Sequence, residues 1–180
     1  MKICLTGGIA CGKSLLSHYL NELGVETIDA DDVVHELIPD PAERRRIAAE
    51  VFADSEKRKA LEARLHPQVR ERIARFLDSS LNTHHSSIRL AVIPLLYEVH
   101  WDADYDIIAC VASSRETQVA RMMTTRGYTR QEAESRLAAQ MPVEEKARKS
   151  HYVIRNDGTA EDLRKQAIAF VAWLRTHVEA

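Results

Sequence analysis

Eight residues near the start of the chain combine glycine, lysine and serine at a fixed spacing: Gly7-Gly8-Ile9-Ala10-Cys11-Gly12-Lys13-Ser14. They fit G-x-x-x-x-G-K-[ST], a loop whose backbone N–H groups surround a phosphate. Glycine permits the dihedral angles and the close approach that such wrapping requires. In loops of this kind the lysine bridges the β- and γ-phosphates and the hydroxyl ligates Mg²⁺. The pattern therefore predicts a site for a nucleoside triphosphate and Mg²⁺.

Within this loop, Lys13 is the expected catalytic cation and Ser14 the expected metal ligand. The guanine-reading string N-K-x-D and the switch string D-x-x-G do not occur in the sequence, which argues against a GTPase switch. The residues that we expect around the triphosphate are Gly7, Gly8, Ala10, Cys11, Gly12, Lys13, Ser14 and Leu15.

An acidic run follows the second apolar segment of the chain and includes Asp29, Asp31 and Asp32. Ligands of open α/β sheets bind beyond the carboxyl ends of the strands, so these acids are expected at the same edge as the phosphate loop. A carboxylate there could accept the proton of an attacking hydroxyl, and we assign this role to Asp31. The alternative is that these acids only cap the next helix, which competes most strongly for Asp32 and Asp29.

Arginines gather around Gly127, where one predicted helix ends and another begins. Arg121 and Arg126 belong to the first helix, and Arg130 and Arg136 to the second. Arginines brought over a transferring phosphoryl group would stabilise its charge and exclude water. We therefore expect a basic helical-hairpin lid, with Arg121 and Arg126 as catalytic residues, although any single arginine here could be a solvated helix residue.

A turn sequence, Asn156-Asp157-Gly158, follows the last predicted strand. Its position at the carboxyl end of a strand allows the backbone of Asn156 and Gly158 to frame an adenine ring. An ordinary turn explains the same residues equally well.

Short apolar runs alternate with helical periodicity, which predicts a parallel sheet. A proline after an N-cap acid at Asp40-Pro41 starts a long helical stretch that runs to about residue 81, with breaks expected near Asp54 and at His66-Pro67. Ser113 and Thr129 each precede a glutamate by three residues, as in a capping box. The expected strands are 2–6, 25–28, 88–93, 106–112 and 152–154, and the other expected helices are 13–23, one after 113, one after 129 and one at the carboxyl terminus.

Composition limits the classes of function. The 180 residues fit one domain, and the formal net charge of −2 gives no sign of nucleic-acid binding. The longest apolar run is too short for a membrane helix and the amino terminus does not resemble a signal peptide, so we expect a cytoplasmic protein. The three cysteines lack paired spacing and are expected to be reduced thiols. No heptad seam marks an interface, so a monomer or weak homo-oligomer is expected.

Several strings in this order, "LTGGIACGKS", "IDAD", "LHP", "PLLYE", "ETQVARMMTTRGYTRQEAESRLAAQ" and "NDG", make the chain resemble bacterial dephospho-CoA kinases. The resemblance implies transfer of the γ-phosphoryl group of ATP to the ribose 3′-hydroxyl of dephospho-CoA, the last step of coenzyme A synthesis. It also implies a three-layer α/β P-loop kinase fold with a five-stranded parallel sheet, a helical substrate-binding insertion and a lid. Glu98 and His66 match family positions for which we assign no role.

These implications divide the single domain into a core at about 1–38, 86–112 and 150–180, an acceptor-binding insertion at about 39–85 and a lid at about 113–149. The chain departs from the family at Leu15, where threonine is usual, and at Cys11, where a smaller residue is usual. It is also shorter than usual between residues 37 and 50. Two alternatives therefore stay open, namely a P-loop kinase for another small nucleoside or nucleotide, and an ATP-binding module without turnover.

Overall fold

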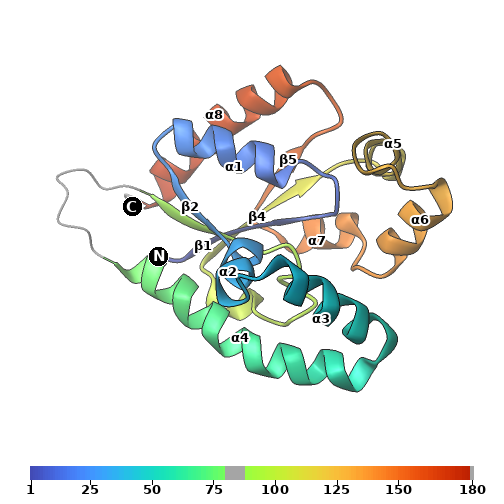
Figure 1. Cartoon of the computed structure of the whole chain (residues 1–180). Helices are drawn as coiled ribbons and strands as arrows, with labels where there is room; N and C mark the ends of the chain where they lie inside the picture. The colour runs from blue at the N-terminus through green and yellow to red at the C-terminus, as the bar shows by residue number, and fades with distance from the viewer. Residues whose placement is uncertain (80–87, 179–180) are drawn as a thin grey trace. The chain divides into compact units, whose positions relative to one another are not determined.

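A computed structural model describes residues 1–79 and 88–178. These residues form two compact units, one built from 1–27 and 88–178 and the other from 28–79. Figure 1 shows the elements of each. The sequence-based boundary between insertion and core at 85/86, and the end of the helical stretch near residue 81, lie outside the described residues.

Five strands form one sheet of order β2-β3-β1-β4-β5. The strands are β1 (Ile3–Gly7), β2 (Glu26–Asp29), β3 (Arg89–Val92), β4 (Ile107–Ala112) and β5 (Tyr152–Arg155). Central β1 pairs in parallel with both β3 and β4, and β4 pairs in parallel with β5. All residues of β1 and β4 are buried, as expected for strands covered on both faces, so the parallel sheet predicted from the sequence is confirmed.

Alternate residues of the strands face two separate helix layers. Ile3, Leu5 and Ala109 join a core with α1 (Lys13–Glu22) and α8 (Ala160–Val178), which pack on each other over one face (Figure 1). On the other face, Cys110 and Ala112 pack against Ala147 of α7 (Val143–Lys149). This alternation gives the three layers that the family resemblance implies.

The hairpin expected around Gly127 is present as α5 (Arg115–Arg126) packed on α6 (Arg130–Ala138). Gly127 ends α5 with a left-handed φ of 67°, and Thr129 and Glu132 form the predicted capping box. The first box is wrong by one residue: Ser114 caps α5, because Ser113 is buried and its hydroxyl donates to the Asn156 carbonyl. Helix α7, which lies inside the range assigned to the lid, packs against β4 and β1.

The smaller unit contains α2 (Ala30–Leu37), α3 (Pro41–Ala53) and α4 (Ser55–Asp78). Asp40 caps α3, as the sequence predicts, and Asp54 caps α4 at the break that the sequence predicts there. The break expected at His66-Pro67 is wrong, since α4 continues through Pro67. Leu65, Val69 and Ile73 form one buried stripe across that position, and their packing outweighs the hydrogen bond lost at proline.

Among the described residues, no helix is both long and apolar enough to span a membrane.

Candidate active site

The phosphate loop leaves the carboxyl end of β1, between the ends of β3 and β4. It leads directly into α1, whose N-cap residue Gly12 has a left-handed φ of 92° and offers no side chain as a cap. A Cβ on Gly12 would also overlap the side-chain amide of Asn156. Glycine is therefore required at this position for two reasons, its dihedral angle and its close neighbour.

Helix α1 begins without a side-chain cap and without an acid in its first turn. The first N–H groups of a helix lack intrahelical partners and carry its positive end. Ser14 and Leu15 lie in this first turn and are exposed. An anion at this end of α1 would meet N–H donors and the Ser14 hydroxyl without competition from a carboxylate.

The side chain of Lys13 folds back over the loop. Its Nζ donates to the carbonyl oxygens of Gly7 at 3.0 Å and Gly8 at 2.8 Å. These bonds hold the ammonium group beside the loop backbone, where the loop pattern predicts the β- and γ-phosphates.

Cys11 belongs to the hydrophobic core under the loop and is fully buried. Burial raises the pKa of its thiol, an effect opposed by the charge of Lys13. The neutral thiol therefore contributes packing, and only the backbone of Cys11 is suited to contact with a phosphate. Ala10, the preceding residue, is held in a left-handed conformation with φ of 58°.

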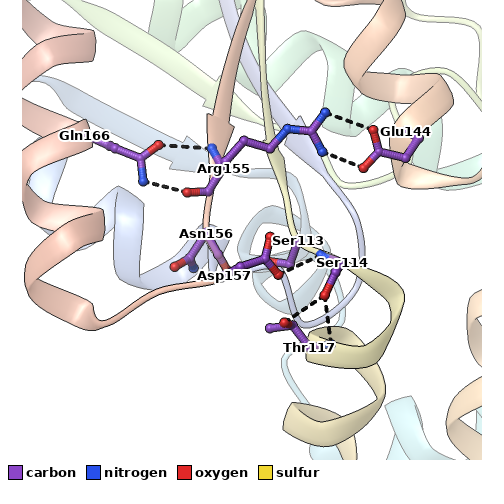
Figure 2. A network of polar contacts seen from close by, with 8 residues as sticks. All are labelled: Ser113, Ser114, Thr117, Glu144, Arg155, Asn156, Asp157 and Gln166. Carbon is purple, nitrogen blue, oxygen red and sulfur yellow. Dashed lines mark hydrogen bonds and ion pairs between the residues drawn. The ribbon is translucent and has the colours of Figure 1, made fainter.

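Asn156 lies directly behind the loop rather than at its rim. It is buried, and its side-chain amide donates to the Cys11 carbonyl at 2.8 Å. The neighbouring carboxylate of Asp157 accepts the N–H of Ser114 at 2.7 Å, and hydrogen bonds from Thr117 and Ser114 lower its pKa (Figure 2). Gly158 is exposed. The Asn156 side chain thus supports the triphosphate loop, while the adenine contact predicted for its backbone and for Gly158 stays a prediction.

The two arginines assigned to the lid have different surroundings. Arg121 is half-buried, and one of its guanidinium nitrogens lies 3.2 Å from the Ser113 hydroxyl and 3.4 Å from the Ala10 carbonyl. Arg126 is exposed in the last turn of α5. The structure therefore brings Arg121 to the phosphate loop.

Asp31 lies in the smaller unit, exposed in the first turn of α2. Its N–H donates to Asp29 Oδ1 at 2.9 Å, so Asp29 is the N-cap of this helix. The alternative that these acids only cap the next helix is therefore correct for Asp29. The carboxylate of Asp31 does not serve as the cap. Its assignment as the base stays a prediction.

Two buried polar side chains were not predicted from the sequence. Gln118 is buried on α5, and its amide donates to the Ile9 carbonyl at 2.7 Å. Lys146 is fully buried on α7 and pairs with Glu98 at 2.7 Å. One sequence signal could have identified Gln118. It adjoins the apolar residues Val119 and Met122 on the buried face of a helix.

The donor set of the loop fits Mg²⁺ held mainly by phosphate oxygens and water. Ser14 offers one hydroxyl, and Mg²⁺ in phosphoryl-transfer sites keeps several water ligands and few protein ligands. Among residues 1–79 and 88–178, no cluster of three or more His, Cys, Asp or Glu side chains is arranged to hold a metal ion by itself.

Comparisons with known proteins identify a matching family and similar chains. A family model described as "Dephospho-CoA kinase" matches residues 1–44 and 41–162. The dephospho-CoA kinase of Geobacter sulfurreducens is 40% identical over 185 residues, covering 91% of this chain and 93% of that protein.

Solved structures support the same fold. A crystal structure from Thermus thermophilus has a TM-score of 0.79 and 34% identity, with 97% of each chain covered. Shikimate kinase from Acinetobacter baumannii has a TM-score of 0.63 at 16% identity, covering 98% of this chain and 93% of the other, which supports the P-loop kinase fold alone.

Proposed function

The chain belongs to the dephospho-CoA kinase family, and on that premise we propose that it transfers the γ-phosphoryl group of ATP to the ribose 3′-hydroxyl of dephospho-CoA. The observation that carries the proposal is the family match. It extends through the phosphate loop, Asp31 and the α5–α6 hairpin, which carry the groups that we propose for the reaction.

The phosphate loop binds the triphosphate of ATP in this proposal. Backbone N–H groups from Gly8 to Ser14 and the positive end of α1 hold the β- and γ-phosphates. Lys13 exchanges the carbonyl oxygens of Gly7 and Gly8 for phosphate oxygens, which costs little because the ammonium group already lies beside the loop. Ser14 is the ligand for Mg²⁺, which when bound neutralises charge on the transferring phosphoryl group.

Asp31 acts on the acceptor. Its carboxylate takes the proton of the 3′-hydroxyl as that oxygen attacks, an effect of about 10²–10⁴-fold in rate. Exposure in the first turn of α2 leaves this carboxylate accessible to a substrate. The α2–α4 unit is the proposed acceptor-binding part of the enzyme.

The arginines stabilise developing charge. Arg121 already lies beside Ala10, so it contributes to ATP binding as well as to catalysis. Arg126 is exposed and meets the phosphates only when the hairpin closes, so its contribution belongs to the transition state.

One feature favours keeping a different acceptor as the second candidate. The family match is divided at residues 41–44, inside the 37–50 segment that is shorter than usual, at the start of α3. If the enzyme phosphorylated a different acceptor by the same chemistry, its acceptor-binding unit would differ from that of the family and its phosphate loop would be kept. The divided match has this pattern.

The deciding experiment measures ADP release with Mg-ATP and either dephospho-CoA, AMP, adenosine or no acceptor, using Lys13→Ala as the inactive control. We expect turnover with dephospho-CoA alone, with product mass increased by one phosphoryl group. Turnover with AMP or adenosine instead would replace the acceptor while keeping the kinase. Binding of ATP without turnover on any acceptor would identify a nucleotide-binding module.

A further inference from the structure

Three successive carbonyl groups of the phosphate loop accept hydrogen bonds from side chains of other elements. Gln118 Nε2 donates to Ile9 at 2.7 Å and Asn156 Nδ2 donates to Cys11 at 2.8 Å. Between them, Arg121 approaches Ala10 at the longer distance of 3.4 Å. Two of these donors come from α5 and one from the residue after β5, segments more than 100 residues along the chain from the loop.

Gln118 has the environment of a fixed residue. Its side chain is 4% exposed, and its neighbours Val119 and Met122 form a buried cluster with Ile9 and Ala10 packed against it. A Cβ on Gly8 would lie 2.5 Å from Gln118 Nε2, so glycine at position 8 is what allows the amide to approach the loop. A buried amide with a 2.7 Å bond to a backbone carbonyl has little freedom to move.

A peptide unit has its carbonyl and the following N–H on opposite sides. Because Gln118 holds the carbonyl of residue 9 toward itself, the N–H of residue 10 points away from Gln118. A loop held in this way does not need to be ordered by the ligand, and affinity falls in proportion when the competent conformation is only partly populated.

We propose that Gln118 is a positioning residue for nucleotide binding, holding the Ile9 carbonyl so that the loop amides face the phosphates before the ligand arrives. This inference rests on the proposed function only in that a nucleotide binds at the loop. In this proposal Gln118 anchors α5 to the phosphate loop, and the same helix also carries Arg121 and Arg126.

The test compares Mg-ADP dissociation constants, by calorimetry without acceptor, for the unchanged protein, Gln118→Met and Gln166→Met. Gln166 is the matched control because its amide also bonds to backbone groups, those of Arg155, and none of its bonds reaches the phosphate loop (Figure 2). We expect Gln118→Met to weaken Mg-ADP binding about tenfold and Gln166→Met to change it less than twofold. In kinetics, the KM for ATP should rise with the KM for the acceptor unchanged.

Gln118→Glu supplies a second readout that a purely structural role would not move. Burial at this position raises the pKa of the new carboxyl, so its charged form at pH 8 repels the Ile9 carbonyl, while the protonated form that gains population toward pH 5 can donate to it. The ratio of its dissociation constant to that of the unchanged protein should therefore approach one as the pH falls to 5. Urea midpoints confirm that each variant is folded under the binding conditions.

Equal Mg-ADP affinities for Gln118→Met and Gln166→Met would overturn the proposal, as would a Gln118→Glu protein that binds as weakly at pH 5 as at pH 8. These results do not depend on the acceptor. Normal binding of Mg-ADP by the unchanged protein without turnover of dephospho-CoA would reject the proposed function instead.

Discussion

The ammonium nitrogen of Lys146 lies 2.7 Å from Oε1 of Glu98, and the lysine side chain is fully buried. The same nitrogen donates to the Pro94 carbonyl at 2.7 Å, and the same carboxylate oxygen accepts the N–H of Met141 at 3.0 Å. The pair thus ties the segment after β3 to the beginning of α7. Glu98, which matched the family without a role, is a tertiary contact that fixes this helix.

Lys146→Met should destabilise the protein by about 3 kcal/mol, because it leaves a largely buried carboxylate without its cation. Urea unfolding measures the loss. The double variant Lys146→Met/Glu98→Leu should recover part of it, since no unpaired charge remains.

The exposed pair between Glu144 of α7 and Arg155 is the matched control for that experiment. Glu144→Gln should cost less than about 1 kcal/mol, because exposed ion pairs contribute little. If Lys146→Met cost no more than Glu144→Gln, the structural role of the buried pair would be wrong.

Asp31→Asn should lower turnover by about 10²–10⁴-fold with nearly unchanged ATP affinity, because it removes the proposed base and no phosphate contact. Asp32 is the adjacent acid in the same helical turn and is equally exposed. Asp32→Asn should therefore retain turnover within about threefold. Steady-state kinetics of both variants decide the matter, and similar losses in the two would remove Asp31 from the base role.

Substitutions of Arg121 and Arg126 should have different effects on KM and kcat. Arg121→Met should raise the KM for ATP and lower kcat, because Arg121 lies beside the phosphate loop. Arg126→Met should lower kcat, by up to about 10²-fold, with little change in KM, since its contact forms on closure. Arg130→Met serves as control, because Arg130 is exposed and near Glu134. An unchanged kcat for Arg126→Met would exclude it from the closed site.

Gly12→Ala and Gly127→Ala should differ although both positions have positive φ. At Gly127 a Cβ would meet open space, so alanine should cost only about 1 kcal/mol of backbone strain. At Gly12 the Cβ would also displace the Asn156 amide and the loop that it holds. We therefore expect loss of ATP binding for Gly12→Ala alone, measured by calorimetry; equal affinities would contradict the tight contact.

The three cysteines are buried, and burial raises the pKa of Cys110 to about 12. The folded protein therefore keeps this thiol protonated at pH values where an unfolded chain loses the proton. The stability due to the neutral thiol is complete below about pH 9 and is lost as the pH rises toward 12. The free energy of unfolding should fall as the pH rises from about 9 toward 12, and it should fall less for a Cys110→Ala protein.

The sequence alone predicted the phosphate loop, the order of the strands along the chain and the starts of several helices, whereas α7 was not among the expected helices. Each of these depends on local spacing: glycines beside a lysine, alternating apolar runs, and caps such as Asp40 and Thr129. The family resemblance followed from the same strings.

Only the tertiary structure decided which side chains support the loop and which helix continues. Gln118, Asn156 and the Lys146–Glu98 pair act on backbone groups distant in sequence, and no local pattern records which partner a buried polar group will find. Helix α4 continues through Pro67 for a similar reason. Burial of Val69 and Ile73 outweighs the tendency of proline to end a helix. Packing energies are shared among elements, so they become visible only once the chain has folded.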